Sequence, residues 1–512
     1  MRQRATLKAS EQGKNLINQA RRSRGWIIED ENWLIEASKI LDPNLPPGVY
    51  ASGVSLTTWK HFLRASRAIY ASTFKAFCEV LELNWKNVVI LNIDLTDAPE
   101  LSSFYGRTNE LKKLHHWLQE RSRLVVIHGV GGIGKTALAR QLGENIASKY
   151  DYIIWRSLDY TQTFQQLLKE LVQFLSKGQD QEVDISRLMK YLRNHRCLLV
   201  LDEWKEIIDK NSQDYQDYSH LLRRVGKENH QSSLLLLSRE KPQNIENLEG
   251  QLIHFLKLEG LSKEEAKQLF IAEGISGKED ELDKLSSRYT NPWIIKQVTK
   301  QVKRVCGGQI PSLVGEISLF FTDTIVSFLD EQFKNLSQLE INIIYWIAIR
   351  RNSASMEQLR RDTLQTLSAL ELFNNLDFLI ERYSLVDKTI NEEDNSIFYT
   401  LDPVIMKYIT NKFVEDNCQD LLKIIPNQTI EGYELFISHS FITSNPEDEQ
   451  LKQEQITRIV KPIHKNLLAE LRSQQRVEEE LRKIMSLLQD RGFSQGYASE
   501  NILHLISASG QI

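Results

Sequence analysis

The 512-residue sequence is poor in cysteine, glycine and proline. The four cysteines lie far apart in sequence, so no two of them have the spacing of metal ligands. They could also form too few disulfide bonds to stabilise a small secreted domain. Glycine and proline, at 23 and 11 residues, fall well below their usual share of roughly 12%, which disfavours turn-dense propellers and favours helices. No stretch approaches the roughly 18 apolar residues of a membrane span, and the N-terminus has no apolar signal segment. We therefore expect a cytoplasmic protein that does not enter membranes.

An excess of charge of one sign is also lacking, since 64 Lys or Arg face 68 Asp or Glu. This balance argues against a protein that binds nucleic acid over most of its surface. Residues 1–93 differ from the rest, with thirteen Lys or Arg against eight Asp or Glu. Four amphipathic helices are predicted there, each beginning at Ser or Asp, over residues 10–22, 30–41, 55–65 and 72–83. We expect a separate N-terminal helical module.

Short apolar runs alternate with helical stretches from about residue 124. The runs LVVIH (124–128), YIIWR (152–156), CLLVL (197–201) and LLLLS (234–238) are typical of buried parallel strands in a doubly wound α/β sheet. Residues 262–330 read as helical. Further helices from residue 337 and two β-like runs about a polar turn then indicate a winged helix, and residues 445–490 read as polar helices.

A glycine-rich motif follows the first apolar run. Residues 129–136 read GVGGIGKT, match GxxxxGK[ST], and open a helical stretch over 137–149. Backbone N–H groups of such a loop reach phosphate oxygens, Lys135 would neutralise the β and γ phosphates, and Thr136 can hold Mg²⁺. A glycine turn before a helix is the structural alternative. We predict an ATP or ADP site with Mg²⁺, formed by Gly129, Val130, Gly131, Gly132, Ile133, Gly134, Lys135, Thr136 and Ala137.

An acidic pair ends the third apolar run, in CLLVLDEW. Asp202 is a candidate metal ligand with Thr136, and Glu203 a candidate base that orients the attacking water. Such a pair is often only a solvated strand end or a helix cap, but the P-loop upstream favours catalysis. Arg239 follows the LLLLS run, where it would either touch a γ-phosphate or remain an ordinary surface arginine. The helix-cap interpretation of Asn291-Pro292 suffices by itself.

The order of these motifs resembles the NB-ARC branch of the STAND NTPases over residues 100 to about 412. FYGRTNEL (104–111) resembles the start of the family's nucleotide domain, which implies that Arg107 approaches the adenine or ribose. LLVLDE is similar to the Walker B motif and LLLLSRE to the first sensor, which implies catalytic roles for Lys135, Asp202, Glu203 and Arg239. TNPWII (290–295) stands where the family has GxPLAL, which implies that Pro292 packs near the base.

The chain departs from this pattern at Thr400-Leu401-Asp402, where the family has a His-Asp pair. Asp402 is kept as a nucleotide-binding candidate, but Leu401 replaces the histidine that would contact the β-phosphate of ADP, which argues against the usual ADP-locked off state. The Asp-Glu pair, where many plant members have Asp-Asp, favours hydrolysis. Cyanobacterial NB-ARC proteins resemble the chain more widely, and WD or pentapeptide repeats commonly follow in them. The chain ends at Ile512, where such a sensor would begin, so either another chain supplies it or the gene is split or truncated.

Residues 55–67 also resemble the recognition helix of a phage-repressor helix-turn-helix. Its candidate DNA contacts are Thr58, Lys60, His61, Arg64 and Arg67. Small helical bundles in this position often bind proteins instead, so DNA and a protein partner, the latter through the N-terminal module or the C-terminal segment, stay open as alternatives.

We predict a multidomain, mainly helical protein with a central α/β P-loop domain. The predicted divisions are an N-terminal helix-turn-helix-like module (1–93), the nucleotide domain (94–258), a helical subdomain (259–330), a winged helix (331–415) and a helical segment (416–512). The first functional hypothesis is a nucleotide-dependent switch that opens and self-associates with ATP and hydrolyses it slowly. A DNA-binding regulator gated by an ATPase and an ADP-holding scaffold without turnover are the alternatives. Leu401 and the missing sensor favour the scaffold, and the acidic pair opposes it.

Overall fold

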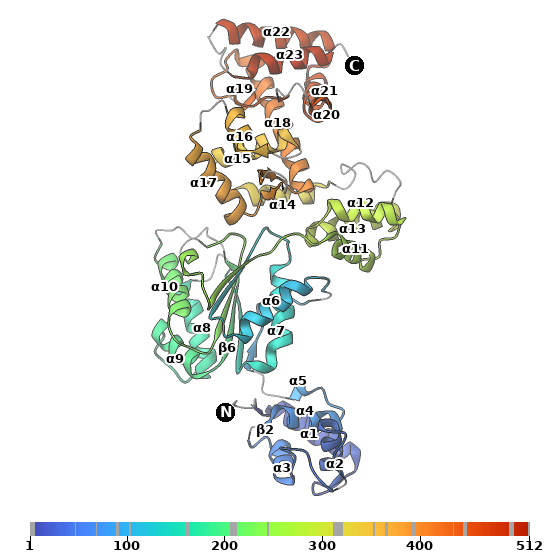
Figure 1. Ribbon diagram of the computed structural model, residues 1–512, viewed down its shortest axis with the longest axis vertical. Coiled ribbons are helices and arrows are strands. Elements are labelled where there is room, and N and C mark those ends of the chain that lie inside the picture. Colours follow the sequence, from blue (N-terminus) through green and yellow to red (C-terminus); the bar gives the residue numbers. More distant parts are fainter. Residues whose placement is uncertain are drawn as a thin grey trace.

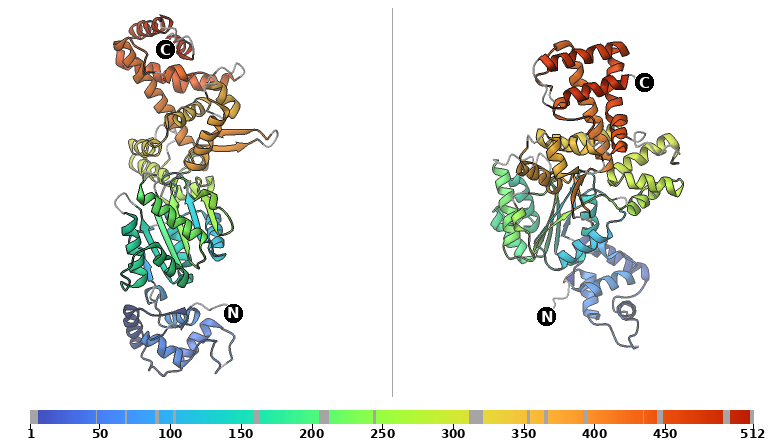
Figure 2. Two further views of the ribbon diagram at one scale, coloured as in Figure 1. Left: turned by 90° about the vertical axis from the view of Figure 1, so that its left-hand side faces the viewer. Right: turned by 45° about the horizontal axis from the view of Figure 1, so that its top comes forward.

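The structure is a computed structural model of the chain, and it is mostly helical around one central parallel sheet. The molecule is elongated, with the N-terminal helices below the sheet and the remaining helices above and beside it (Figures 1 and 2). The described residues are 6–46, 48–67, 69–88, 92–101, 104–158, 163–204, 212–242, 245–310, 321–351, 354–363, 367–391, 395–433, 435–443, 448–490 and 496–509.

The N-terminal module has a hydrophobic core of its own. Aromatic rings fill it: Trp33 stacks on Trp59 with centroids 4.8 Å apart, and Phe77 meets Trp59 edge to face with centroids 5.0 Å apart. The four predicted helices are present, and β1 and β2 pair antiparallel. The elements are β1 (Thr6–Leu7), α1 (Glu11–Arg24), α2 (Asn32–Leu41), α3 (Leu56–Arg64), β2 (Ile69–Tyr70), α4 (Ala71–Val80) and α5 (Trp85–Val88).

The predicted recognition helix is α3, but a long connection precedes it. Residues 42–55 separate α2 from α3, whereas a helix-turn-helix has a turn of three or four residues there. The ammonium of Lys60 pairs with Glu29 at 3.0 Å, and the side chains of Thr58 and His61 bond to neighbouring serines. Of the five candidate DNA contacts, Arg64 and Arg67 are the ones that are exposed.

The central sheet has six parallel strands in the order β3-β5-β6-β7-β4-β8. The four predicted strands are β4 (Leu124–His128), β5 (Tyr152–Ser157), β6 (Cys197–Trp204) and β7 (Ser233–Ser238), and the sequence analysis missed β3 (Asn92–Asp94) and β8 (Ile253–Lys257). β3 follows the N-terminal module directly, so the chain enters the sheet at an edge strand. There Asp94 pairs with Arg156 of β5 at 2.5 Å.

Helices cover both faces of this sheet, and each face has its own core. Long apolar faces and side-chain caps explain the helices, as in α8, where Thr163 and Gln166 form a capping box. One face carries α6 (Thr108–Gln119) and α7 (Lys135–Ile146). The other carries α8 (Phe164–Ser176), α9 (Ile185–Asn194) and α10 (Gln213–Lys227), as Figure 1 shows.

The helices beyond the sheet begin with a small bundle of α11 (Lys263–Ala272), α12 (Glu279–Arg288) and α13 (Pro292–Cys306). Next come α14 (Asp323–Phe333), α15 (Gln338–Arg350), α16 (Met356–Asp362) and α17 (Ala369–Asp377). The predicted hairpin is present, because β10 (Asp387–Ile390) pairs antiparallel with β11 (Ile397–Thr400), which also pairs with β9 (Ala354–Ser355). A π-helical turn over 378–382 and the loop after it connect α17 to the hairpin.

The 25-residue helix α18 (Pro403–Asn427) leads from the hairpin to the C-terminal helices. These are α19 (Leu435–Ser438), α20 (Glu449–Gln455), α21 (Lys461–Leu471), α22 (Gln474–Asp490) and α23 (Ala498–Ser509). The boundary drawn at 415/416 lies inside α18, and the one drawn at 330/331 lies inside α14. One continuous hydrophobic core runs from Leu261 to Ala508. We call residues 261–509 the helical body.

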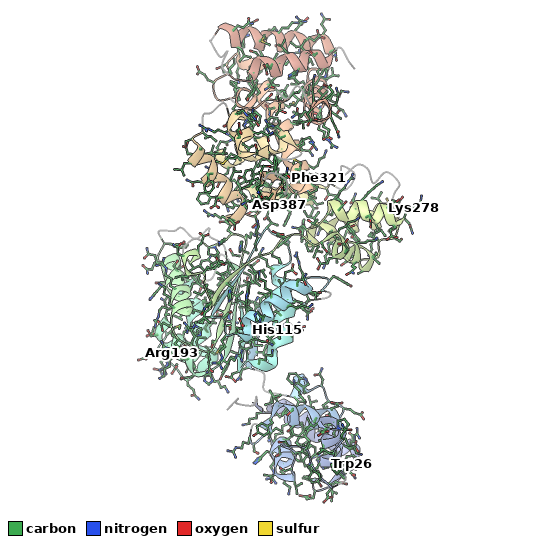
Figure 3. The ribbon with its side chains drawn as sticks, viewed as in Figure 1. Trp26, His115, Arg193, Lys278, Phe321 and Asp387 are labelled. Carbon is green, nitrogen blue, oxygen red and sulfur yellow. The ribbon has the colours of Figure 1, made fainter. Side chains whose placement is uncertain are left out.

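The N-terminal module and the helical body lie at opposite ends of the central sheet. Figure 3 shows Trp26 in the module and Asp387 in the body, on the far side of the sheet. Within the described ranges, no helix is both long enough and apolar enough to cross a membrane.

Candidate nucleotide-binding site

The glycine-rich loop connects β4 to α7 at the carboxyl edge of the sheet. All five residues of β4 are buried, and α7 begins at Lys135, directly after the last glycine of the loop. Gly134 has a φ of 101°, which other residues rarely adopt, and a Cβ on Gly129 would lie 2.6 Å from the carbonyl oxygen of Leu258. The loop thus needs glycine at both ends. It leads into the N-terminus of a twelve-residue helix, a favourable place for a phosphate.

Lys135 reaches back across the loop. Its Nζ donates hydrogen bonds to the carbonyl oxygens of Gly129 at 2.7 Å and Val130 at 3.0 Å. Burial lowers the pKa of Lys135 to about 7, and the positive charge of Arg239 adds to this effect. Arg239 itself is exposed, directly after the end of β7. An arriving anion would therefore stabilise the charged form of Lys135.

Thr136 and Asp202 meet beneath the loop. The Thr136 hydroxyl donates to Asp202 Oδ1 at 3.2 Å, and the same oxygen accepts the Glu203 N–H at 2.8 Å. Asp202 is 5% exposed, and burial raises the pKa of its carboxyl. Hydroxyl and carboxylate oxygens are the ligands that Mg²⁺ prefers, so this pair fits a Mg²⁺ ion that also binds phosphate oxygens.

Glu203 lies in a bulge near the end of β6. The register between β6 and β7 shifts between Leu201 and Trp204, and the φ of Glu203 is 58°, in the left-handed region. A bulge redirects a side chain, and here Glu203 is exposed while both of its neighbours are buried. The Ser157 hydroxyl at the end of β5 donates to Glu203 Oε2 at 2.5 Å. The carboxylate is thereby held at the carboxyl edge of the sheet.

Arg107 donates hydrogen bonds to the backbone of the loop and of the segment after β8. It is 4% exposed, and its Nη2 donates to the carbonyl oxygens of Ile133 at 3.0 Å and Glu259 at 2.6 Å. Its Nη1 pairs with Glu110 at 3.0 Å, and its backbone N–H donates to Glu265 at 2.6 Å. Arg107 thus joins the P-loop to the start of the helical body, and it is not among the residues that line the cavity described below.

The N-terminus of α13 lies directly on the loop. Asn291 Nδ2 donates to the carbonyl oxygen of Gly131 at 2.9 Å, and the Trp293 N–H donates to that of Gly132 at 3.2 Å. Asn291 also caps α13, as its sequence context predicts. Between these two residues, Pro292 approaches Gly134, since a Cβ built there would lie 3.9 Å from Pro292 Cγ.

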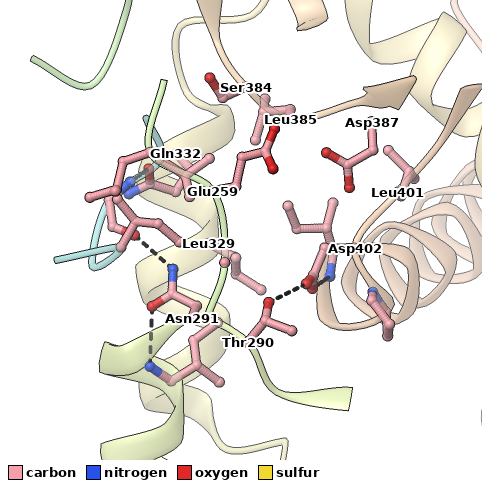
Figure 4. A pocket seen from close by; sticks show the side chains of 18 of the residues that line it. Glu259, Thr290, Asn291, Leu329, Gln332, Ser384, Leu385, Asp387, Leu401 and Asp402 are labelled. Carbon is pink, nitrogen blue, oxygen red and sulfur yellow. Dashed lines mark hydrogen bonds between the residues drawn. The ribbon is translucent and has the colours of Figure 1, made fainter. Parts of the chain in front are cut away.

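A cavity of about 420 Å³ opens beside the loop, between the sheet and the helical body (Figure 4). One wall contains Val130, Gly131 and Ile133, and the opposite wall comes from residues 384–405. Glu259, Asp387 and Asp402 are among the residues that line it, so the lining contains three carboxylates. The walls therefore come from segments more than 250 positions apart in sequence.

The two residues of the altered His-Asp signature both line this cavity. Leu401 is buried in the core of the helical body. Asp402 caps α18, because its Oδ1 accepts the backbone N–H groups of Val404 and Ile405, and the Thr290 hydroxyl donates to its Oδ2 at 3.1 Å. In this structure, the carboxylate of Asp402 thus joins the hairpin region to the segment before α13.

The structure gathers most of the predicted site residues at one edge of the sheet, and it adds others. Val130, Gly131, Ile133 and Asp402 line the cavity, Thr136 and Asp202 bond to each other, and Ala137 lies in the first turn of α7. The sequence analysis missed Ser157 and Gln332, and it treated Asn291 only as a helix cap. Gln332 has no motif around it and contacts Gly131 from 201 positions away.

Comparison with known proteins supports a nucleotide-binding domain. The NB-ARC domain model matches residues 107–280. An uncharacterized WD repeat-containing protein of Nostoc sp. is 33% identical over 98% of this chain and 46% of its own length. A probable disease resistance protein of Arabidopsis thaliana is 32% identical over 20% of this chain and 13% of its own length. The chain thus spans about half or less of these relatives.

Solved structures similar to the chain include two archaeal ATPases. A Walker-type ATPase of Pyrococcus abyssi has a TM-score of 0.42 and 16% identity, covering 60% of this chain and 96% of its own. A STAND protein with a tetratricopeptide repeat sensor, from Pyrococcus horikoshii, has a TM-score of 0.32 and 14% identity, covering 80% of this chain and 59% of its own. The loop geometry and the sequence matches agree: residues 107–280 of the chain carry an NB-ARC domain with a P-loop.

Proposed function

We propose that the chain is a nucleotide-dependent switch, which is closed with ADP, opens when ATP replaces it, and self-associates when open. The observation that carries this proposal is the 420 Å³ cavity, because its walls come from both the P-loop and residues 384–405. A ligand that touches both walls binds the closed and the open form differently. Only such a differential interaction shifts a conformational equilibrium.

The site residues divide the chemistry among them. Lys135 neutralises the outer phosphates, and Arg239 senses the γ-phosphate from the end of β7. Thr136 and Asp202 would hold Mg²⁺, which would supply positive charge beside the phosphates. Glu203 orients and deprotonates the attacking water, and its exposed carboxylate at the sheet edge supports this role. Hydrolysis is expected to be slow and to reset the switch.

The remaining predicted residues shape the base and ribose end of the site. Pro292, next to Gly134, packs near the base. Arg107 acts through the loop carbonyl that it holds. Asp402 acts through its bond to Thr290, which closes the hairpin region onto the nucleotide. We further propose that the N-terminal module or residues 416–512 bind a protein partner.

The test is the bound nucleotide and the mass of the protein. The purified chain should release ADP on denaturation, and light scattering should show a larger species with Mg²⁺ and a non-hydrolysable ATP analogue than with ADP. Lys135→Ala should lose both nucleotides while far-UV circular dichroism stays unchanged, because the change removes the charge nearest the phosphates. Equal nucleotide occupancy in Lys135→Ala and the parent would refute the site.

An ADP-holding scaffold without turnover is the second candidate. The observation that favours it is Leu401, a buried apolar side chain where the family signature has a polar one. A steady-state phosphate-release assay separates the two functions. A parent chain that binds ADP tightly, keeps one mass with both nucleotides and releases no phosphate is the scaffold.

A further inference from the structure

A side chain from the helical body occupies one of the hydrogen-bond donors of the P-loop. Gln332 lies near the end of α14, and its Oε1 accepts the backbone N–H of Gly131 at 2.9 Å (Figure 4). The contact is close, since a Cβ built on Gly131 would lie 2.5 Å from Gln332 Nε2. The amide therefore rests directly against the loop.

This contact lies at the end of the loop that meets the last phosphate. In a P-loop, the lysine reaches the β and γ phosphates, whereas the later N–H groups and the helix N-terminus hold the inner phosphates. Here Lys135 Nζ contacts the carbonyl oxygens of Gly129 and Val130, so its charge marks the early residues of the loop as the outer end. Gly131 is the next residue, and its N–H donates to Gln332.

Two other side chains, from α14 and from the start of α13, cover the next residue of the loop. The rings of Phe328 and Trp293 stack with centroids 4.1 Å apart. Both side chains lie against Gly132, because a Cβ built there would lie 2.6 Å from Trp293 Cβ and 3.1 Å from Phe328 Cζ. The loop is thus covered at two consecutive glycines, by the amide of Gln332 and by this aromatic pair.

We propose that Gln332 makes the closed form select a nucleoside diphosphate over a nucleoside triphosphate, because its amide oxygen takes the Gly131 N–H at the γ-phosphate end of the loop. A diphosphate needs the inner donors and leaves the amide in place. A triphosphate must displace it. This inference rests on the proposed nucleotide switch and names the residue that discriminates between its two ligands.

The helix that carries Gln332 also contacts α18. On the same helix, Asp330 accepts a hydrogen bond from the hydroxyl of Tyr408 at 2.5 Å, and the ring of Phe333 lies 5.2 Å from that of Tyr408. Tyr408 belongs to α18, which begins at the cavity wall. The γ-phosphate is therefore linked through α14 to the long helix of the helical body.

The experiment measures dissociation constants of the full chain for ADP and for a non-hydrolysable ATP analogue, both with Mg²⁺. Gln332→Ala should tighten binding of the analogue by about 10- to 100-fold, the range for a hydrogen bond to a charged group, and that of ADP by less than about 3-fold. Glu331→Ala, at the exposed neighbouring position on α14, is the matched control and should change neither constant.

Two more variants keep the test decisive. Gln332→Met retains the length of the side chain without its acceptor, so it should behave like Gln332→Ala even if the shorter side chain perturbs α14. Gln332→Glu keeps an acceptor and adds a negative charge, so it should weaken binding of the analogue more than that of ADP. An equal change for both nucleotides, or no change for the analogue, overturns the role of Gln332. A parent and variants that all fail to bind either nucleotide overturn the proposed function as well.

Discussion

The N-terminal module and the helical body are both helical, but they are connected to the sheet in different ways. The module has a separate core and enters the sheet through β3, whose Asp94 pairs with Arg156. The helical body shares one core from Leu261 to Ala508 and reaches the P-loop with Asn291, Trp293 and Gln332. The P-loop is thus in direct contact with the body, whereas the sheet separates it from the module.

The strongest test of this difference is Glu203→Gln, which keeps the size of the side chain and removes the proposed base. Turnover should fall by about 10² to 10⁴, or roughly 3 to 5 kcal/mol in activation free energy, while ATP stays bound. The ATP form of the helical body should then persist, as seen by light scattering, and the module should melt as in the parent. Asp202→Asn is the contrast, because it should weaken the dependence on Mg²⁺ instead. Unchanged turnover in Glu203→Gln would move the base role to another residue.

Trp59→Ala tests, by a change within the module itself, whether the module is independent of the nucleotide site. Trp59 is fully buried among aromatic rings, so its loss should cost the module about 3 to 5 kcal/mol of unfolding free energy. The affinity for ADP should not change. Residues 1–93 alone should melt cooperatively, and Trp59→Ala should lower that melting temperature; Trp26→Ala, at a half-buried position, should lower it less. A variant that loses ADP binding together with the module would show that the two parts are not independent.

Acid should weaken the helical body. Burial lowers the pKa of His439 to about 4, and this ring stacks on Trp346. The unfolded chain binds this proton below about pH 6.5 and the folded body does not, so stability is full above pH 6.5 and is lost as the pH falls. The loss at pH 5 is about 2 kcal/mol relative to pH 7. His439→Phe keeps the ring and should reduce the difference between urea midpoints at pH 7 and pH 5; an unaltered difference would assign the acid response to other groups.

The smallest expected effect concerns DNA. Any duplex binding by the module should be weak and should depend on Arg64 and Arg67, the exposed members of the candidate set. Neutralising both to Gln should reduce the slope of log affinity against log salt by about 2, measured by fluorescence anisotropy. Lys60→Gln is the control and should change little, because Lys60 already pairs with Glu29. A slope that does not respond to Arg64 and Arg67 would leave protein association as the role of this surface.

Local patterns predicted most of the central fold. The four apolar runs became β4, β5, β6 and β7, because a strand buried on both faces needs apolar residues at every position. The other two strands escaped for physical reasons. β8 reads IHFLK, in which His254 and Lys257 interrupt the apolar run. β3 has three residues that are stabilised by pairing with β5 rather than by their own composition.

The same distinction between local patterns and long-range contacts applies to the candidate site. Sequence motifs predicted the residues that lie within a few positions of a strand end. These are Gly129 to Ala137, Asp202, Glu203 and Arg239. The contacts that close the site do not follow from motifs, since Gln332 reaches Gly131 from another region and Arg107 reaches Glu259 across 152 positions. The bulge at Glu203 is also not visible in the sequence. The register shift between β6 and β7 reveals the bulge, and the φ of 58° shows that the backbone of Glu203 is left-handed.

The length of α18 determines how far a small tilt at the site would displace the other end of the helix. A helix of 25 residues is about 37 Å long at 1.5 Å per residue, and its capped end at Asp402 lies on the cavity wall. A tilt of about 10° at that end displaces the far end by about 6 Å. If the proposed switch tilts α18 at the nucleotide cavity, the far end of the helix would therefore move by more than a turn of helix, beside α19 to α23.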